Sequence, residues 1–166
     1  RVESVDHAIQ VLSDELEAKI LAGGHSLLPL MRVRLARPSF LVDISRIQDL
    51  KYVKEDGDQV AIGALTRHHD VSNSEVLHEL CPIVAYAAGE IGDPQVRHVG
   101  TIGGSVAHAD PASDMPTVLL ALGAEMVVRG PDGNVRNVPA GNFFKGLFEP
   151  DLATNEVLTE IRVPKT

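Results

Sequence analysis

This 166-residue sequence contains a single cysteine, Cys81, and no tryptophan. One cysteine excludes a disulfide framework, and it excludes an iron–sulfur or cysteine-ligated zinc site built within the chain. A lone thiol suits a reducing compartment, so we expect a cytoplasmic protein. Free cysteine behaves as a small hydrophobic residue, and Cys81 lies in an apolar stretch before Pro82. We therefore expect Cys81 to be buried.

Basic residues are also scarce, since 15 lysines and arginines face 23 acidic residues and the net charge is −8. A protein that tracks a nucleic-acid backbone needs a basic patch, and aromatic residues for base stacking make up only 4% of the chain. We expect no nucleic-acid partner. No apolar run approaches the ~20 residues of a membrane helix, so we expect no membrane insertion. The polar start, residues 1–7, is not a signal peptide.

Familiar catalytic and nucleotide-binding motifs are missing as well. The seven histidines show neither H-E-x-x-H nor zinc spacing, and adjacent residues such as His68 and His69 would diverge by ~100° on a helix. The chain has no G-x-S-x-G elbow, no G-x-G-x-x-G and no P-loop. No acid–base pair stands out. The sequence thus predicts no metal site and no catalytic side chain.

The elements that are present mix helices with strands. Apolar periodicity predicts helices over residues 5–17, 27–35, 67–73 and 75–91, and another that starts near Pro111. It predicts strands over residues 18–22, 40–44, 52–54, 59–62, 125–129, 134–138 and 156–163. Asp56-Gly57 and residues 130–133 indicate hairpins, which make the sheets partly antiparallel. The predicted fold class is therefore α+β, with a possible break into two lobes near residues 45–50.

Finer expectations concern helix caps and one strand face. Ser4, Thr66 and Ser74 are placed to cap the helices that follow them. In the last strand, alternation predicts one shared face, formed by Val157, Thr159, Ile161 and Val163.

Two glycine-rich segments could bind a ligand. Ala22-Gly23-Gly24-His25-Ser26 follows a predicted strand and precedes a predicted helix. Glycines there would let the backbone present N–H groups and a helix N-terminus to a phosphate. Residues 100–105, Gly-Thr-Ile-Gly-Gly-Ser, would expose backbone N–H groups in the same way and allow a flat ring system to approach closely. Each segment could equally be a tight turn without a ligand.

Asp114 lies one turn into the helix predicted from Pro111. Its carboxylate could accept a hydrogen bond from a ribose hydroxyl or a flavin N–H. It could equally stabilise the helix N-terminus, which is worth ~0.3–1 kcal/mol.

Several segments together resemble one family, in the same order along nearly the whole chain. They are residues 21–31, 34–38, 41–44, 62–66, 91–97, 100–105, 110–116 and 158–164. This set resembles the FAD-binding medium subunits of molybdenum hydroxylases, above all those of aerobic carbon-monoxide dehydrogenases. It is also similar to the FAD domain of xanthine dehydrogenases.

The resemblance implies a two-lobed α+β FAD-binding fold of the molybdopterin dehydrogenase type, with lobes of about residues 1–48 and 49–166 and FAD between them. It assigns the pyrophosphate to the first glycine loop: Ala22, Gly23, Gly24, His25, Ser26 and Leu27. It assigns the flavin end to Thr101, Gly103, Gly104 and Ser105, with Ile91 lining the flavin. Asp114 matches an acidic FAD contact, and Leu158 matches a backbone contact in the last strand.

Two departures from the family stand out. Ser105 occupies a position that is often asparagine. The family's C-terminal domain and a short N-terminal strand are absent, so we expect the chain to be a fragment.

The resemblance also implies partners. A molybdenum-binding large subunit would hold molybdopterin, and an iron–sulfur small subunit would carry [2Fe-2S] centres. FAD in this chain would pass their electrons to an external acceptor. Two alternatives remain open. One is a nucleotide- or phosphate-binding module without redox activity, and the other is a self-contained FAD-dependent oxidoreductase.

Overall fold

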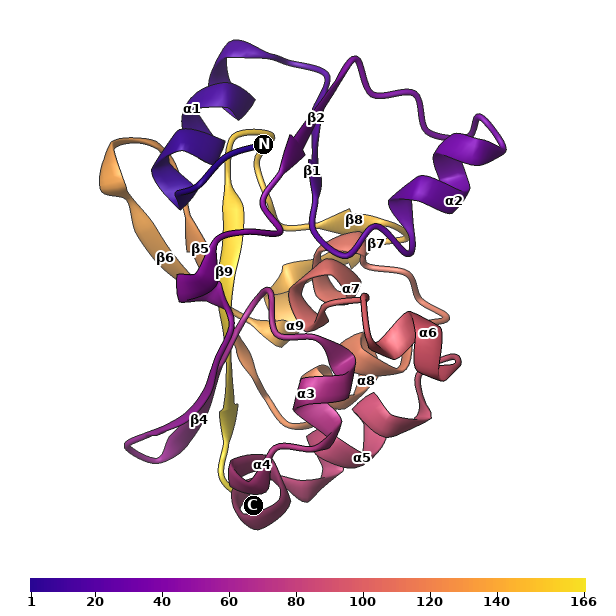
Figure 1. The fold of residues 1–166 in the computed structure, drawn as a ribbon. Helices are drawn as coiled ribbons and strands as arrows, with labels where there is room; N and C mark the ends of the chain where they lie inside the picture. The colour runs from indigo at the N-terminus through magenta and orange to yellow at the C-terminus, as the bar shows by residue number, and fades with distance from the viewer.

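The computed structural model describes residues 1–166 and consists of short helices and strands (Figure 1). The helices are α1 Val5–Asp14, α2 Leu27–Arg32, α3 His68–Ser72, α4 Glu75–Leu80, α5 Pro82–Glu90, α6 Pro94–Arg97, α7 Ile102–His108, α8 Asp114–Ala121 and α9 Ala140–Phe143, with 3-10 turns η1 Gln48–Leu50 and η2 Pro131–Gly133. The strands are β1 Ala18–Leu21, β2 Phe40–Asp43, β3 Val53–Asp56, β4 Gln59–Gly63, β5 Glu125–Arg129, β6 Val135–Pro139, β7 Phe144–Gly146, β8 Glu149–Pro150 and β9 Val157–Pro164.

The strands form three sheets. A five-stranded antiparallel sheet has the order β3-β4-β9-β5-β6, and β7 pairs with β8. The parallel pair β1–β2 is joined by a crossover that contains α2. Both predicted hairpins are present, and Gly57, with a φ of +62°, takes the left-handed conformation expected of a hairpin glycine. The α+β prediction is confirmed.

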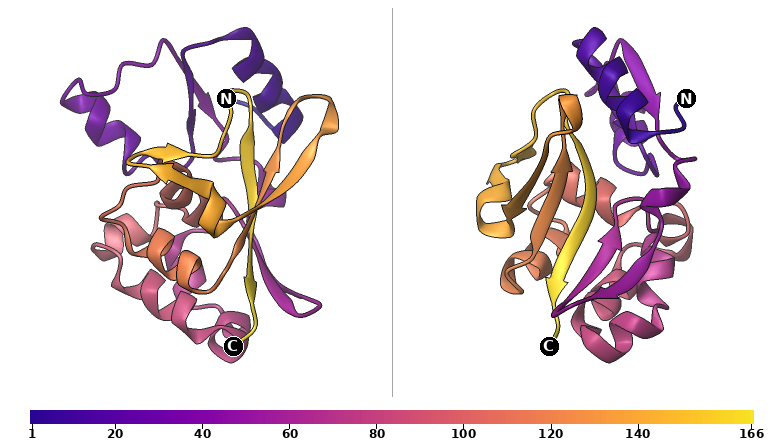
Figure 2. Two further views of the ribbon diagram at one scale, coloured as in Figure 1. Left: turned by 180° about the vertical axis from the view of Figure 1, so that it is seen from behind. Right: turned by 90° about the vertical axis from the view of Figure 1, so that its left-hand side faces the viewer.

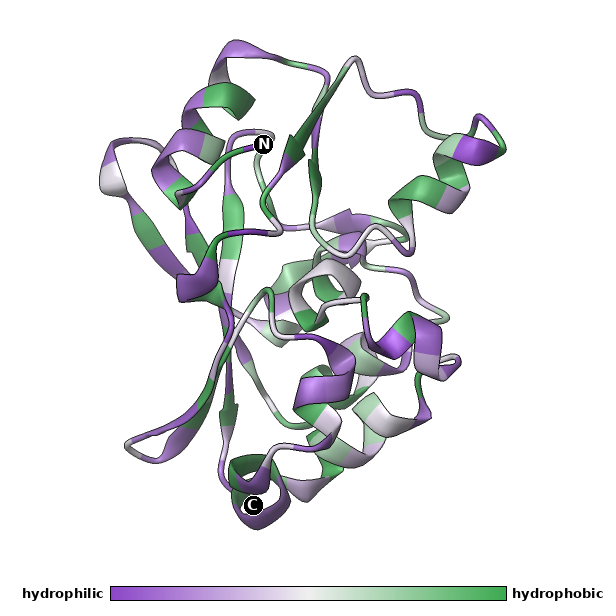
Figure 3. Ribbon diagram, viewed as in Figure 1, coloured by the Kyte–Doolittle hydropathy of each residue, from purple (hydrophilic) through white to green (hydrophobic).

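Two hydrophobic cores pack the sheets and helices together. The larger core has 23 buried residues, most of them from the five-stranded sheet and the helices α3, α4, α5, α7, α8 and α9. The smaller core has 12, and all but Leu65 and Val157 come from residues 2–50. The elements of the smaller core lie above those of the larger one, and the two termini lie at opposite ends of the molecule (Figures 1 and 2). The tip of the β3–β4 hairpin is hydrophilic and exposed (Figure 3).

The structure shortens or divides several predicted helices. Helix α1 ends at Asp14, and Leu16, which was expected to continue it, is 83% exposed. The helix predicted over residues 75–91 is two helices, because Pro82 lacks an N–H and starts α5 anew. Ser4 and Ser74 cap their helices as predicted. Thr66 does not, since its hydroxyl instead exchanges hydrogen bonds with the backbone of Tyr52.

The predicted face of the last strand is wrong because β9 contains a bulge. Val127 of β5 pairs with Glu160 but Val128 pairs with Leu158, so Thr159 is an additional residue. The bulge resets the alternation of side chains. Val157 joins the smaller core, whereas Leu158, Ile161 and Val163 join the larger one.

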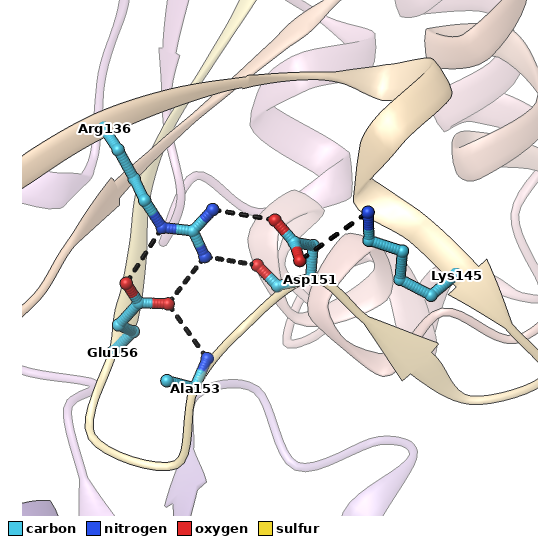
Figure 4. Close-up of polar contacts among 5 residues, drawn as sticks. All are labelled: Arg136, Lys145, Asp151, Ala153 and Glu156. Carbon is cyan, nitrogen blue, oxygen red and sulfur yellow. Dashed lines mark hydrogen bonds and ion pairs between the residues drawn. The ribbon is translucent and has the colours of Figure 1, made fainter.

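A charged cluster fastens the segment before β9 to the edge strand β6 (Figure 4). Arg136 of β6 donates to Glu156 and to both the side chain and the backbone of Asp151, at 2.6–2.9 Å. Glu156 also accepts from the N–H of Ala153. These contacts lower the pKa of both carboxyl groups, mainly through the hydrogen bonds from Arg136.

Candidate functional site

The first glycine segment forms the turn between β1 and α2. Gly24 has a φ of +78°, in the left-handed region that favours glycine. The N–H of Leu28 donates to the carbonyl of Gly24, which starts the helix. Ser26 precedes α2 but makes no side-chain cap, so its hydroxyl remains available.

The backbone of this turn has unused hydrogen-bond donors. None of the five consecutive N–H groups of residues 22–26 donates to an acceptor within the chain. The glycines and Ser26 are only partly buried, and His25 is exposed. Successive free N–H groups in a turn form a concave site for an anion. This turn, hereafter the donor loop, therefore has the chemistry needed to hold a phosphate.

The second glycine segment has a different structure. Residues 102–105 form the first turn of α7, and Thr101 caps that helix by accepting from the N–H of Gly104 at 3.2 Å. The other N–H groups bond within the protein, including Ile102 to Thr66 and Gly103 to Ala64. In residues 100–105, only the N–H of Thr101 lacks an acceptor. This segment is hereafter the α7 turn.

The expectation that these glycines expose N–H groups is therefore wrong. A Cβ on Gly103 would lie 2.5 Å from the Cβ of Ala64 and 2.6 Å from its carbonyl oxygen. Gly103 is glycine because α7 packs directly on the end of β4. Gly104 and Ser105 are only partly buried, so they remain the positions of this turn that a ligand could reach.

The two glycine segments touch each other. A Cβ on Gly23 would collide with the carbonyl oxygen of Val99 and would lie 2.8 Å from the Cα of Gly100. The structure thus brings the donor loop against Val99 and Gly100, at the start of the α7 turn. In Figure 1 the loop from β1 to α2 runs directly above α7.

The other predicted site residues, Asp114, Ile91 and Leu158, lie outside the two glycine segments. Asp114 is the first residue of α8 rather than lying one turn inside it, and its exposed carboxylate makes no hydrogen bond within the chain. Ile91 follows α5, and its carbonyl accepts from Arg97 at 3.0 Å. Leu158 has its side chain in the larger core and its backbone paired with Val128, so it has no free side chain for a ligand.

None of the predicted site residues lines either of two surface cavities, each of about 410 Å³. One lies between α1, η1, β5 and β9, and Tyr52, Glu160 and Arg162 line it. Burial and the hydrogen bond to Glu160 raise the pKa of Tyr52, so this phenol stays protonated. The other cavity lies between α1 and η2.

His68 is the residue beside the site that sequence reasoning missed. It was considered only as a metal ligand, but the residue is 3% exposed and its ring lies against Gly100. The structure contains no cluster of three or more His, Cys, Asp or Glu side chains that could hold a metal ion. No helix has both the length and the apolar character needed to cross a bilayer.

Comparison with known proteins shows one family. The model described as "FAD binding domain in molybdopterin dehydrogenase" matches residues 1–166. The carbon monoxide dehydrogenase medium chain of Hydrogenophaga pseudoflava is 47% identical over 98% of this chain. The glyceraldehyde dehydrogenase medium chain of Sulfolobus acidocaldarius is 43% identical over 99% of it. This chain spans 56% and 58% of those two proteins.

Solved structures agree with the sequence relatives. Carbon monoxide dehydrogenase from H. pseudoflava superposes with a TM-score of 0.96 at 46% identity, covering 99% of this chain and 57% of that one. Quinoline 2-oxidoreductase from Pseudomonas putida 86 gives a TM-score of 0.96 at 36% identity, with the same coverage of both chains.

Proposed function

Because this chain belongs to the family of FAD-binding domains in molybdopterin dehydrogenases, we propose that its donor loop holds the pyrophosphate of FAD. The observation that carries the proposal is the run of five free N–H groups in residues 22–26. Ser26 adds a free hydroxyl, and Leu27 begins the helix whose N-terminus faces the loop. With a formal charge near −2, a pyrophosphate is the type of group that such backbone donors bind best.

The flavin end is proposed to lie along the α7 turn, between lobes of about residues 1–48 and 49–166. Gly104 and Ser105 offer a partly open helix surface there, while Thr101 has the one N–H of the turn without an acceptor. Gly103 acts indirectly by seating α7 on Ala64. Ile91 would line the ring, and the backbone of Leu158 would contact FAD.

The proposed role is electron transfer within a larger complex. Bound FAD supplies the redox chemistry, because it can accept and release electrons one or two at a time, and the protein supplies binding and orientation. A single buried Cys81 cannot ligate an iron–sulfur cluster. Iron–sulfur centres in a small subunit would therefore deliver electrons from a molybdenum-binding large subunit, and FAD would pass them to an external acceptor.

A titration of the full-length subunit with FAD tests the binding proposal. We expect a yellow complex that contains one flavin per subunit and retains it during gel filtration. The same preparation, assayed alone with dye acceptors and carbon monoxide, aldehydes or purines, should show no turnover. A colourless protein that still binds ADP would favour the nucleotide-binding module. Turnover by the isolated subunit would favour a self-contained oxidoreductase.

Asp114 offers a second test of the same proposal. Asparagine stabilises a helix start nearly as well as aspartate but cannot make a charge-assisted hydrogen bond, which is worth ~1.5–3 kcal/mol. Asp114→Asn should weaken FAD binding by about tenfold or more and leave the melting temperature of the apoprotein almost unchanged. If instead only the apoprotein loses stability, Asp114 serves the helix end and not the cofactor.

A further inference from the structure

His68 is a buried polar residue whose own hydrogen bonds do not explain it. The residue is 3% exposed, and Nδ1 of its ring has no hydrogen-bond partner. Burial lowers the pKa of the imidazole to about 4, so the ring is neutral at neutral pH. A buried polar atom without a partner costs about 1–3 kcal/mol. A residue that only filled space here would be expected to be hydrophobic.

The position of His68 is fixed against Gly100, the first residue of the α7 turn. Its N–H donates to the carbonyl of Gly100 at 3.0 Å. A Cβ on Gly100 would lie 3.2 Å from Cδ2 of His68 and 3.7 Å from its Nε2. The edge of the imidazole therefore occupies the space that a side chain at position 100 would need.

Gly100 is also in contact with the donor loop. A Cβ on Gly23 would meet the carbonyl oxygen of Val99 at 2.3 Å and the Cα of Gly100 at 2.8 Å, whereas a Cβ on Gly100 would meet the carbonyl oxygen of Val96 at 2.9 Å and then the His68 ring. The imidazole, the Gly100 backbone and the Gly23 backbone thus form three successive layers.

We infer that His68 is a positioning residue for the donor loop. Its imidazole sets the position of Gly100, and Gly100 sets the position of Gly23 and the direction of the free N–H groups of residues 22–26. The link to FAD rests on the function proposed above. His68 itself need not touch the cofactor, because it acts from the second lobe on a loop of the first.

Three variants of the full-length subunit test this inference. His68→Ala removes the ring beneath Gly100 and should lower FAD affinity about tenfold. His68→Asn keeps an atom near the position of Cδ2 and should stay within about threefold of the original affinity. Leu77→Ala is the matched control, because Leu77 is fully buried in the larger core and none of the close contacts of the two glycine segments involves it. It should lower the melting temperature without changing FAD affinity.

Either of two results would overturn the inference. If His68→Ala binds FAD normally, the ring does not position the loop. If Leu77→Ala loses as much affinity for a similar loss of melting temperature, the effect of His68 is general destabilisation.

A double-mutant cycle tests transmission through Gly100. Gly23→Ala forces a Cβ against Val99 and Gly100. If His68→Ala leaves room for Gly100 to move, Gly23→Ala should cost at least about threefold less affinity in that background. Equal costs in both backgrounds would contradict the layered contact.

A measurement without FAD keeps the two proposals separate. In the ¹⁵N-labelled apoprotein, His68→Ala should shift the amide resonances of Gly23 and Gly24, and Leu77→Ala should not. Unmoved resonances would refute the positioning role even if the original protein binds FAD. Failure of the original protein to bind FAD would refute the proposed function while the shifts could still be present.

Discussion

The donor loop and the α7 turn have similar glycine content but opposite uses of the backbone. In the donor loop all five N–H groups of residues 22–26 are free. In residues 100–105 all but that of Thr101 bond within the protein. The glycines differ accordingly, since Gly24 provides a left-handed turn whereas Gly103 provides close packing on Ala64.

The comparison shows that a glycine run does not by itself identify a ligand site. The informative property is where the backbone donors go, because a buried N–H is nearly always paired and an unpaired one is available for a ligand. On this measure the donor loop has the free backbone donors that the proposed pyrophosphate site needs, whereas the backbone of the α7 turn is used for packing within the protein. Variants of the two segments should therefore affect different quantities.

The largest expected effect is on stability, from Gly103→Val. Its Cβ would lie 2.5–2.8 Å from three atoms of Ala64, so α7 would have to leave the end of β4. We expect a loss of about 3 kcal/mol or more in the free energy of unfolding of the apoprotein, measured by urea denaturation. Gly141→Val is the control, because nothing lies within 4 Å of its Cβ. A Gly103→Val protein that is stable but fails to bind FAD would contradict the structural role of Gly103 in the α7 turn.

The next effect is on binding, from Gly24→Ala. The left-handed backbone costs a residue with a Cβ ~1–2 kcal/mol, and the loop can relieve that strain by turning its N–H groups away from the ligand. FAD affinity should fall about tenfold, with little change in melting temperature. Gly57→Ala carries the same kind of strain in a remote hairpin, at a φ of +62°, and should leave affinity unchanged. Equal losses of affinity in the two variants would show that the donor loop has no special role.

The smallest effect should come from the charged cluster of Figure 4, which belongs to neither segment. Arg136→Met should destabilise the protein by about 1 kcal/mol at pH 7 and leave FAD affinity intact. Arg136 lowers the pKa of Asp151 and Glu156, so their contribution is present above the ordinary values of 3.8 and 4.5. It is lost as the pH falls through the lower folded-state values. Thermal melts from pH 7 to 3 should show the variant and the original converging, and a constant gap would contradict this account.

Local chemistry made the elements of the fold predictable. Hairpins at Asp56-Gly57 and residues 130–133 and caps at Ser4 and Ser74 depend on neighbouring residues only, and all are present. What could not be predicted depends on residues distant in sequence. The hydroxyl of Thr66 bonds to Tyr52 rather than to its own helix, and the bulge at Thr159 arises where β9 pairs with β5.

The candidate site shows the same division. The glycine, serine and acidic positions could be named from the sequence and from its family resemblance. The contact between Gly23 and Gly100 could not, because residues 77 positions apart meet only in the folded chain. The place of His68 beneath Gly100 depends on the same long-range packing, and no local pattern distinguishes it from the adjacent His69.

The bulge in β9 has a consequence for how the molecule melts. The extra residue brings Leu158 onto the same side of the strand as Ile161 and Val163 in the larger core, while the neighbouring Val157 lies in the smaller core. Detachment of β9 would expose apolar surface in both cores. Unfolding that begins in one core therefore also costs free energy of burial in the other. The calorimetric enthalpy and the van't Hoff enthalpy should therefore coincide, with one heat-absorption peak for a chain that has two cores.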